Sequence, residues 1–157
     1  MTAGQARLGA LVRIATGVLF IAEGYGKITG PFVQGGFARS VAGMASESWP
    51  FWRSFLESVV KPHAAVFGWF VALGELFLGV ALAAGFLTRI AAACGVLLLL
   101  TILLGQTYVP GSRWVAWVTA GLTTKFAILL LLSIAAVGHG AWGLDGRLRK
   151  AHRPRLR

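Results

Sequence analysis

Charged residues are scarce in this chain, and acidic residues are the scarcest of them. Only 13% of the 157 residues are charged, with 5 Asp and Glu against 15 Lys and Arg, while 57% are hydrophobic. Soluble domains carry about 25% charged residues. We therefore expect an integral membrane protein rather than a soluble enzyme, with a single membrane domain over residues 1–157.

Cysteine and histidine are also scarce, which limits the chemistry that the chain can perform alone. The one cysteine, Cys94, lies in an apolar run, so no intrachain disulfide and no cysteine metal site can form. His63 and His139 fall at opposite ends of predicted spans, about 30 Å apart, and cannot share a haem. Because no His or Cys residues cluster, we expect no metal and no covalently bound cofactor. Quinone is the diffusible carrier that the chain could bind.

Long apolar runs take the place of the missing charge. Four of them approach the length of about 20 residues that a membrane-spanning helix needs. They cover about residues 8–28, 64–86, 90–109 and 118–138. We therefore predict an all-α fold, a four-helix bundle in the membrane. The first run continues into "AEGYGK" without a small-residue cleavage site, so we expect a retained span rather than a signal peptide.

Basic residues set the expected orientation. One side of the membrane would hold Arg7, Arg89 and the tail over residues 139–157, which ends in "RLRKAHRPRLR". The other side would hold bases farther from the spans: Arg39, Arg53, Lys61 and Arg113. Because cytoplasmic flanks carry the excess of Lys and Arg, we expect both termini in the cytoplasm, at a bacterial inner membrane. A membrane flank also explains the basic tail without nucleic acid.

The outer connection over residues 29–63 is too long for a plain turn. Pro50 suits the first turn of a helix, and one face of that helix would be apolar: Trp52, Phe55, Leu56 and Val59. Charges four residues apart would form a second face: Arg53, Glu57 and Lys61. We predict an amphipathic helix on the outer membrane surface. The alternative is docking onto partner subunits, for which the candidate contacts are Trp49, Trp52, Phe55, Arg147, Arg149, Lys150 and Arg153.

Ionisable residues occur inside the predicted spans, where each costs about 2.5–3.5 kcal/mol or more unless it is paired or hydrated. The candidate intramembrane polar site contains Arg13, Glu23, Lys27, Glu75, Gln106 and Lys125. We expect Glu23 to pair with Lys27 or Lys125, and Glu75 with Arg13 or Lys125. These charges either fix the register of the helices or line a polar site that opens outward, and the sequence leaves both alternatives open.

Glycines lie on the same faces as these charges. Gly17 and Gly24 follow Arg13 at helical spacing, and Gly68 and Gly79 flank Glu75 in the same way. Small residues let neighbouring helices in a membrane approach closely. We therefore predict that the first and second spans pack through these two faces.

Three segments together resemble DoxX and DoxD-like membrane proteins. These are "RIATGVLFIAEGYGKI", "GELFLGVALAAGFLTRIAAACGVLLLL" and "GHGAWGLDGRL", the last with Leu144 and Asp145. The resemblance implies a four-helix membrane bundle and a link to redox chemistry, since related subunits belong to a thiosulfate:quinone oxidoreductase and others to thiol or oxidative-stress systems. Glu23 departs from the family pattern, in which many members carry a His or an apolar residue before the glycine.

We therefore expect a non-catalytic accessory subunit of a larger respiratory or photosynthetic membrane assembly. The alternative is a subunit of a quinone-linked oxidoreductase that uses the polar intramembrane site. A small-molecule or ion carrier is a third hypothesis, which is weaker because no inverted repeat is visible. The expected partners are the lipid bilayer, other membrane subunits and quinone.

Overall fold

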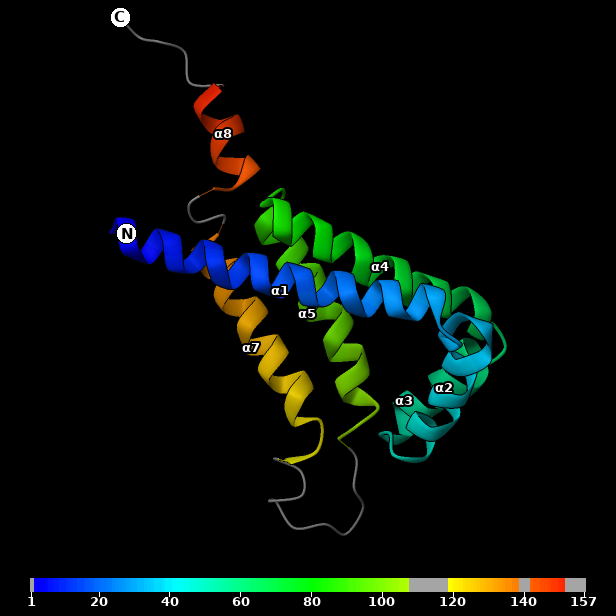
Figure 1. Ribbon diagram of the computed structural model, residues 1–157. Helices are drawn as coiled ribbons and strands as arrows, with labels where there is room; N and C mark the ends of the chain where they lie inside the picture. Colours follow the sequence, from blue (N-terminus) through cyan, green and yellow to red (C-terminus); the bar gives the residue numbers. More distant parts are fainter. Residues whose placement is uncertain (1, 108–118, 139–141, 152–157) are drawn as a thin grey trace, which may run out of the picture.

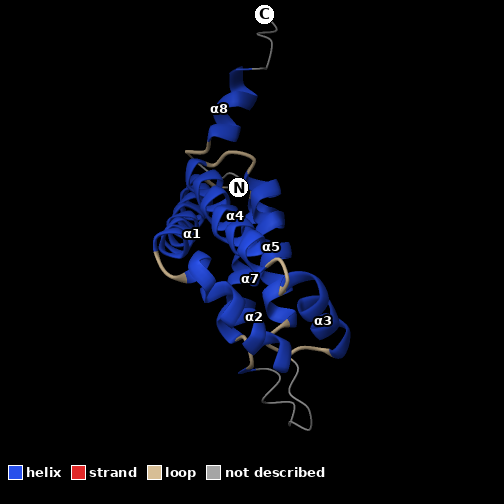
Figure 2. Cartoon of the chain, turned by 90° about the vertical axis from the view of Figure 1, so that its right-hand side faces the viewer, coloured by secondary structure: helices blue, strands red, loops and turns tan. Residues whose placement is uncertain are grey.

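The computed structural model describes residues 2–107, 119–138 and 142–151, and all regular elements in these ranges are helices (Figures 1 and 2). Four long helices occur at the four apolar runs: α1 (Ala3–Thr29), α4 (Ala64–Ala84), α5 (Thr88–Leu104) and α7 (Leu122–Val137). Helix α1 lies along α4, α5 lies along α7, and α4 contacts α5. The predicted all-α class is confirmed. The predicted span ends at Val109 and Val118 lie outside the described residues.

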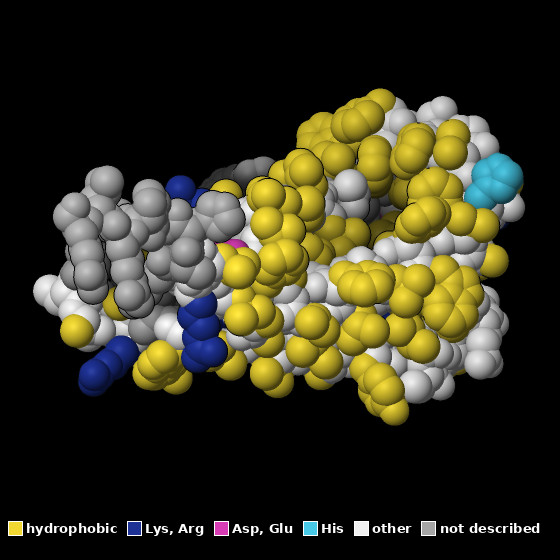
Figure 3. Space-filling view, turned by 90° about the horizontal axis from the view of Figure 1, so that it is seen from above, with side chains coloured by type: hydrophobic (Ala, Val, Ile, Leu, Met, Phe, Trp, Pro, Cys, Tyr) yellow, Lys and Arg dark blue, Asp and Glu magenta, His cyan; other side chains and the backbone are white. Residues whose placement is uncertain are grey.

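The outside of the bundle is apolar, as lipid requires. Helices α1 and α4 are long and apolar enough to cross a membrane, and α5 and α7 are shorter apolar helices of 17 and 16 residues. At 1.5 Å per residue, the 21 residues of α4 extend about 32 Å, which matches a hydrocarbon core of about 30 Å. Phe70 and Phe77 on α4 are 71% and 69% exposed. Figure 3 shows apolar side chains over much of one face.

Helix α1 begins before the apolar run because its first turn is capped. Thr2 accepts a hydrogen bond from the backbone of Gln5, whose side chain accepts one from Thr2 in return. This capping box satisfies two of the four N–H groups that a helix start leaves without partners. The helix therefore starts five residues ahead of the predicted boundary at Leu8.

The contact between α1 and α4 is made by glycine. A Cβ atom at Gly17 would lie 2.5 Å from the backbone nitrogen of Ala83, and one at Gly24 would lie 2.6 Å from that of Leu76. From the other side, a Cβ at Gly79 would lie 2.6 Å from the backbone nitrogen of Ile21. The two helices therefore touch backbone to backbone, which confirms the predicted meeting of the two glycine faces.

Gly68 packs elsewhere. A Cβ atom at Gly68 would lie 3.2 Å from Cβ of Phe37, which belongs to α2 (Phe37–Ser46). No helix was predicted over these residues, although the apolar residues Phe37, Val41 and Ala45 are spaced four apart, as on one face of a helix. All three are buried. The prediction that Gly68 packs against α1 is therefore wrong, because α2 lies over this end of α4.

The connection between α1 and α4 forms a helical hairpin on the end of the bundle. After α1, a kinked turn η1 (Phe32–Gly36) leads into α2, and α3 (Pro50–Phe55) continues as the π-helical turn η2 (Leu56–Val60). Leu56 and Val60 are buried against α2. The predicted apolar face is partly wrong, because Phe55 and Val59 are exposed. Because η2 is a π-helical turn, the next buried residue after Leu56 is Val60 rather than Val59.

The predicted charge ladder on this segment is also wrong. Arg53 turns away from Glu57 and donates hydrogen bonds to the carbonyl oxygens of Ala45 and Ser46, at 2.6 and 2.8 Å. These carbonyls are at the end of α2, where the last four C=O groups of a helix have no partners within it. Arg53 therefore joins α3 to α2, and the hairpin is held by a cap rather than by surface ion pairs.

The turn between α4 and α5 is capped by the last helix, α8 (Leu144–Ala151). Gly85 and Leu87 have φ of +68° and +47°, a conformation that is costly for Leu87. The carboxylate of Asp145 accepts hydrogen bonds from the backbone of Leu87 and Thr88, at 2.8 and 2.9 Å. The backbone N–H of Asp145 donates to Gly85 at 2.9 Å. A residue near the end of the chain thus caps the start of α5.

We predict that Gly17→Ala lowers the thermal stability of the detergent-solubilised protein by about 1–3 kcal/mol, because its Cβ would overpack the backbone of α4. Gly26→Ala on the same helix is the control, since a Cβ there meets nothing within 4 Å. The control should be neutral or stabilising by up to about 1 kcal/mol. Equal melting temperatures for the two variants would contradict the close approach of the helices.

We predict that Asp145→Ala destabilises the protein by about 0.5–2 kcal/mol through loss of the cap on α5. Asp145→Asn keeps one carbonyl oxygen as an acceptor and should fall between the wild type and the alanine variant. Thermal unfolding followed by circular dichroism measures this order. A wild-type melting temperature for Asp145→Ala would show that the cap contributes nothing.

Candidate functional site at the end of helix α1

Lys27 lies between two carboxylates. Its Nζ atom donates a hydrogen bond to Glu75 Oε2 at 2.5 Å and another to Glu23 Oε2 at 3.2 Å. The side chain of Glu75 is 6% exposed, that of Lys27 is 21% exposed, and that of Glu23 is 73% exposed. The three groups therefore form a graded series from the interior to the surface, with two negative charges on one cation.

The helix packing explains this arrangement. Glu23 and Lys27 are four residues apart on α1, so their side chains lie one above the other. Because Gly24 sits on the backbone of Ala72 and Leu76, the next turn of α1 passes Glu75 on α4. The predicted pair of Glu23 with Lys27 is confirmed. The predicted pairing of Glu75 with Arg13 or Lys125 is wrong, because Glu75 forms its ion pair with Lys27.

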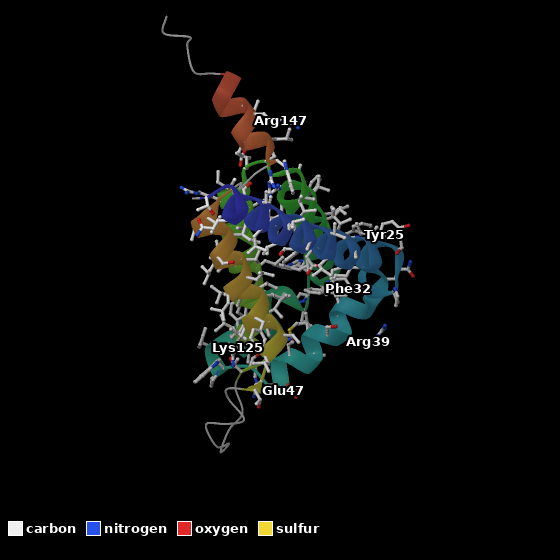
Figure 4. All side chains as sticks on the ribbon, turned by 60° about the vertical axis from the view of Figure 1, so that its left-hand side comes forward. Tyr25, Phe32, Arg39, Glu47, Lys125 and Arg147 are labelled. Carbon is white, nitrogen blue, oxygen red and sulfur yellow. The ribbon has the colours of Figure 1, made fainter. Side chains whose placement is uncertain are left out.

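A pocket of about 560 Å³ opens beside Lys27. Its lining comes from the end of α1, the turn η1 and the start of α2, and includes Glu23, Lys27, Phe32, Arg39 and Ser40. The ring centroid of Phe32 lies 5.6 Å from Lys27 Nζ, within the range of a cation–π contact. Figure 4 shows Tyr25, Phe32 and Arg39 along this corner of the molecule. The pocket therefore offers two cations, a hydroxyl, a carboxylate and an aromatic wall.

The backbone of η1 brings Arg39 to the pocket. Gly35 has φ of +111°, which favours glycine. A Cβ atom at Gly36 would lie 2.8 Å from the carbonyl oxygen of Pro31 and 3.8 Å from Arg39 Nη2. The glycine pair thus lets the chain turn sharply from α1 into α2. Phe32, Arg39 and Ser40 were not predicted as site residues. The sequence feature that could have indicated them is the glycine pair before a helix in "PFVQGGFARS".

Arg13 lies at the other end of the α1–α4 contact. Its side chain is 0% exposed, and Nη1 donates to the carbonyl oxygens of Leu82 and Ala83, the latter at 3.0 Å. The predicted pair of Arg13 with Glu75 is therefore wrong. Within the described part of the chain, Nε and Nη2 of Arg13 have no hydrogen-bond partner. Arg13 caps the carbonyl end of α4, where a cation also complements the helix dipole.

Gln106 and Lys125 lie in a third place, just after α5 and near the start of α7. The hydroxyl of Thr124 donates to Gln106 Oε1 at 3.0 Å, which joins the start of α7 to the residues after α5. Neither Gln106 nor Lys125 lines the pocket beside Lys27. Figure 4 shows Lys125 on α7, well separated from Tyr25 on α1. The six predicted polar residues thus fall in three places, and the structure brings together Glu23, Lys27 and Glu75.

Among the residues that the structure describes, no three His, Cys, Asp or Glu side chains are placed to hold a metal ion. The pocket beside Lys27 therefore offers charge and hydrogen bonds rather than metal ligands. The ammonium and guanidinium groups of this lining can donate hydrogen bonds, and its carboxylate can accept them.

Comparison with known families gives one match. The family model named DoxX matches residues 8–107, which is 100 of the 157 residues. The chain belongs to the DoxX family. No curated protein and no solved structure matches it. Membership agrees with the apolar exterior, and this DoxX chain is a membrane protein in contact with a lipid bilayer.

The DoxX match contains the whole pocket beside Lys27, since its lining residues fall between Ala22 and Ser40. It ends before α7 and α8, so Leu144 and Asp145, which carried part of the resemblance, lie beyond it. The cap on α5 therefore depends on a segment outside the matched region.

The remaining candidate contacts of this DoxX chain are spread over its two ends. Trp49 is 38% exposed and donates through Nε1 to Thr107 at 3.4 Å, and the half-buried Trp52 stacks on Phe55 with centroids 4.9 Å apart. Arg147 is exposed on α8. The side chains of Arg149 and Lys150, and all of Arg153, lie outside the described residues. Whether these groups dock to partners stays a prediction.

We predict that Lys27→Met destabilises the protein by about 3–5 kcal/mol, because it leaves the Glu75 carboxylate buried without its cation. The double variant Lys27→Met/Glu75→Gln should recover most of that loss. Glu23→Gln should change stability by less than about 1 kcal/mol, since solvent screens this exposed partner. Thermal unfolding of the single and double variants in one detergent measures the coupling, and additive effects would rule out a direct ion pair.

Proposed function

We propose that this DoxX family member is a subunit of a quinone-linked membrane oxidoreductase, and that the pocket beside Lys27 receives the polar head group of the quinone. The observation that carries the proposal is the pocket itself, in which Lys27 is held by a buried and an exposed carboxylate beside Arg39 and Ser40. In this proposal α1, α4, α5 and α7 all cross a bacterial inner membrane. Both termini are then cytoplasmic, and the α2–α3 hairpin lies at the outer surface.

The lining suits the two oxygens and the ring of a quinone. Arg39 and Lys27 supply donors for a carbonyl oxygen, and Glu23 supplies an acceptor for a quinol hydroxyl. The hydroxyl of Ser40 donates to the carbonyl oxygen of Gly36, so its oxygen is a further acceptor. Phe32 supplies an apolar wall for the ring. The pocket residues hold and orient the head group and take up or release protons, while a partner subunit exchanges the electrons. The expected accessory role is thereby kept, with a ligand-binding task added to it.

A purely structural accessory subunit is the second candidate. The observation in its favour is that the ion pair of Lys27 with Glu75 joins the same two helices that touch through glycine. Under this hypothesis the charges fix the register of α1 on α4, and the pocket binds nothing. The two functions differ in what the exposed pocket residues do, because Arg39 takes no part in the ion pair.

Photoaffinity labelling tests the first proposal. The full chain in lipid nanodiscs is irradiated with an azidoquinone, and the labelled peptides are mapped by mass spectrometry. We expect labels between residues 22 and 40, reduced about tenfold in Arg39→Gln through loss of a charged donor. Lys61→Gln is the matched control, because Lys61 is an exposed cation that does not line the pocket. Equal labelling of both variants would contradict the proposal.

The assembly containing the native chain separates the two candidates. After purification in mild detergent, Arg39→Gln should strongly lower quinone-dependent turnover while the assembly stays intact if the pocket binds quinone. If the charges only join the helices, Glu75→Gln should lower the yield and melting temperature of the subunit, with turnover per assembled complex unchanged.

A further inference from the structure

Two hollows meet at the turn between α4 and α5. The first, here called the turn pocket, measures about 530 Å³ and is lined by residues of this turn and of the α7 and α8 ends, including Thr88, Arg89 and Gly138. The second, here called the α4–α5 groove, measures about 720 Å³ and is almost wholly apolar in its lining. Leu87 and Ile90 line both. The two hollows therefore adjoin each other at Leu87 and Ile90, and one is partly polar while the other is apolar.

Arg89 supplies the charge at the polar end. Its side chain is exposed and makes no hydrogen bond or ion pair in the part of the chain that the structure describes. It lies over Gly138, where a Cβ atom would be 3.3 Å from Arg89 Nε. Thr88 lines the same pocket, and its hydroxyl is buried without a partner among the described residues. Because this hydroxyl has almost no accessible surface, Arg89 is the side-chain donor that the hollow presents to a ligand.

Asp145 is the negative group that lines this pocket. Its two carboxylate oxygens accept the backbone N–H groups of Leu87 and Thr88 at the start of α5, where the helix dipole offsets negative charge. The basic residues Arg7 and Arg147 are exposed at the same end of the bundle. Figure 3 shows basic side chains gathered at this end of the molecule, while much of the same face is apolar. The turn pocket is therefore lined by one exposed cation, Arg89, and by one carboxylate whose oxygens are bound to backbone N–H groups.

The groove has the dimensions of a lipid chain. Its lining runs along α4 from Phe70 to Ala84, and these 14 steps extend about 21 Å at 1.5 Å per residue. One leaflet of the hydrocarbon core is about 15 Å deep, half of about 30 Å. Gly74 opens the groove, since a Cβ atom there would meet nothing within 4 Å. An acyl chain that starts at the turn can therefore follow α4 through a whole leaflet.

We propose that these two adjoining hollows are a binding site for an anionic phospholipid, with the phosphate at Arg89 and one acyl chain in the α4–α5 groove. The charge of Arg89 favours anionic head groups over zwitterionic ones. A membrane supplies both kinds, but only anionic head groups carry a net negative charge. This site is separate from the pocket beside Lys27, which lies at the opposite end of α1 and shares no lining residue with it.

Lipid association with the full chain reconstituted in phosphatidylcholine tests the proposal. Spin-labelled phosphatidylglycerol and phosphatidylcholine are added in turn, and electron paramagnetic resonance gives the association constant of each. We expect the wild type to prefer phosphatidylglycerol, and Arg89→Gln to lower that preference about fivefold. Arg7→Gln is the matched control, an exposed base at the same end that lines neither hollow. No preference in the wild type, or an equal loss in both variants, would overturn the site.

The groove is tested by a second pair of variants. Gly74→Leu places a side chain in the groove and should reduce the association of phosphatidylglycerol severalfold. Gly43→Leu on α2 should leave it unchanged, and at both positions the space around the Cβ atom is open. Melting temperatures confirm that both variants fold. If glycerol phosphate alone competes fully with the lipid and Gly74→Leu binds as the wild type, the site recognises a soluble phosphate and the lipid proposal fails.

Discussion

The structure depends first on the backbone contact between α1 and α4. Gly17, Gly24 and Gly79 remove the side chains that would hold these helices apart, and the atoms of one backbone fill the space against the other. In a lipid environment, apolar surface gives helices little reason to associate, so close packing and buried polar contacts supply the attraction. The register of α1 on α4 determines which polar groups meet at the two ends of α1. A shift of α1 by one turn, about 5.4 Å, would separate Lys27 from Glu75 and Arg13 from the end of α4.

The polar groups differ in exposure according to where they lie along that contact. Arg13 is wholly enclosed and bound to backbone carbonyls at the end of α4. Lys27 joins the interior to the surface, since one of its partners is buried and the other is exposed. The pocket forms at the surface end of this series because η1 and α2 fold back over α1 and bring Arg39 with them. A site of this kind is assembled by a turn and two helices, rather than by one span.

Much of the fold was predictable from the sequence, since long apolar runs and the spacing of glycine are strong signals. The four long helices and the meeting of the glycine faces followed from these patterns, as did the pair of Glu23 with Lys27 four residues later. The pairing of Glu75 with Lys27 did not follow from these patterns. An estimate of how deep each residue lies in the membrane assumes that the helices are parallel and centred at the same level. The glycine contacts instead shift α1 along α4, and this shift cannot be obtained by counting residues. The hairpin of α2 and α3 was predicted only in part, because a π turn changes the spacing of buried residues after Phe55.

Asp145 has a consequence for the order in which the molecule is completed. The amides of Leu87 and Thr88 at the start of α5 receive their acceptor from a residue 58 and 57 positions farther along the chain. During synthesis, the hairpin of α4 and α5 is therefore completed only after Asp145 has been made. Arg13, from α1, already binds the other side of the same turn. Helices α1 and α8 thus close around one corner, and a chain that stops before Asp145 leaves that corner open.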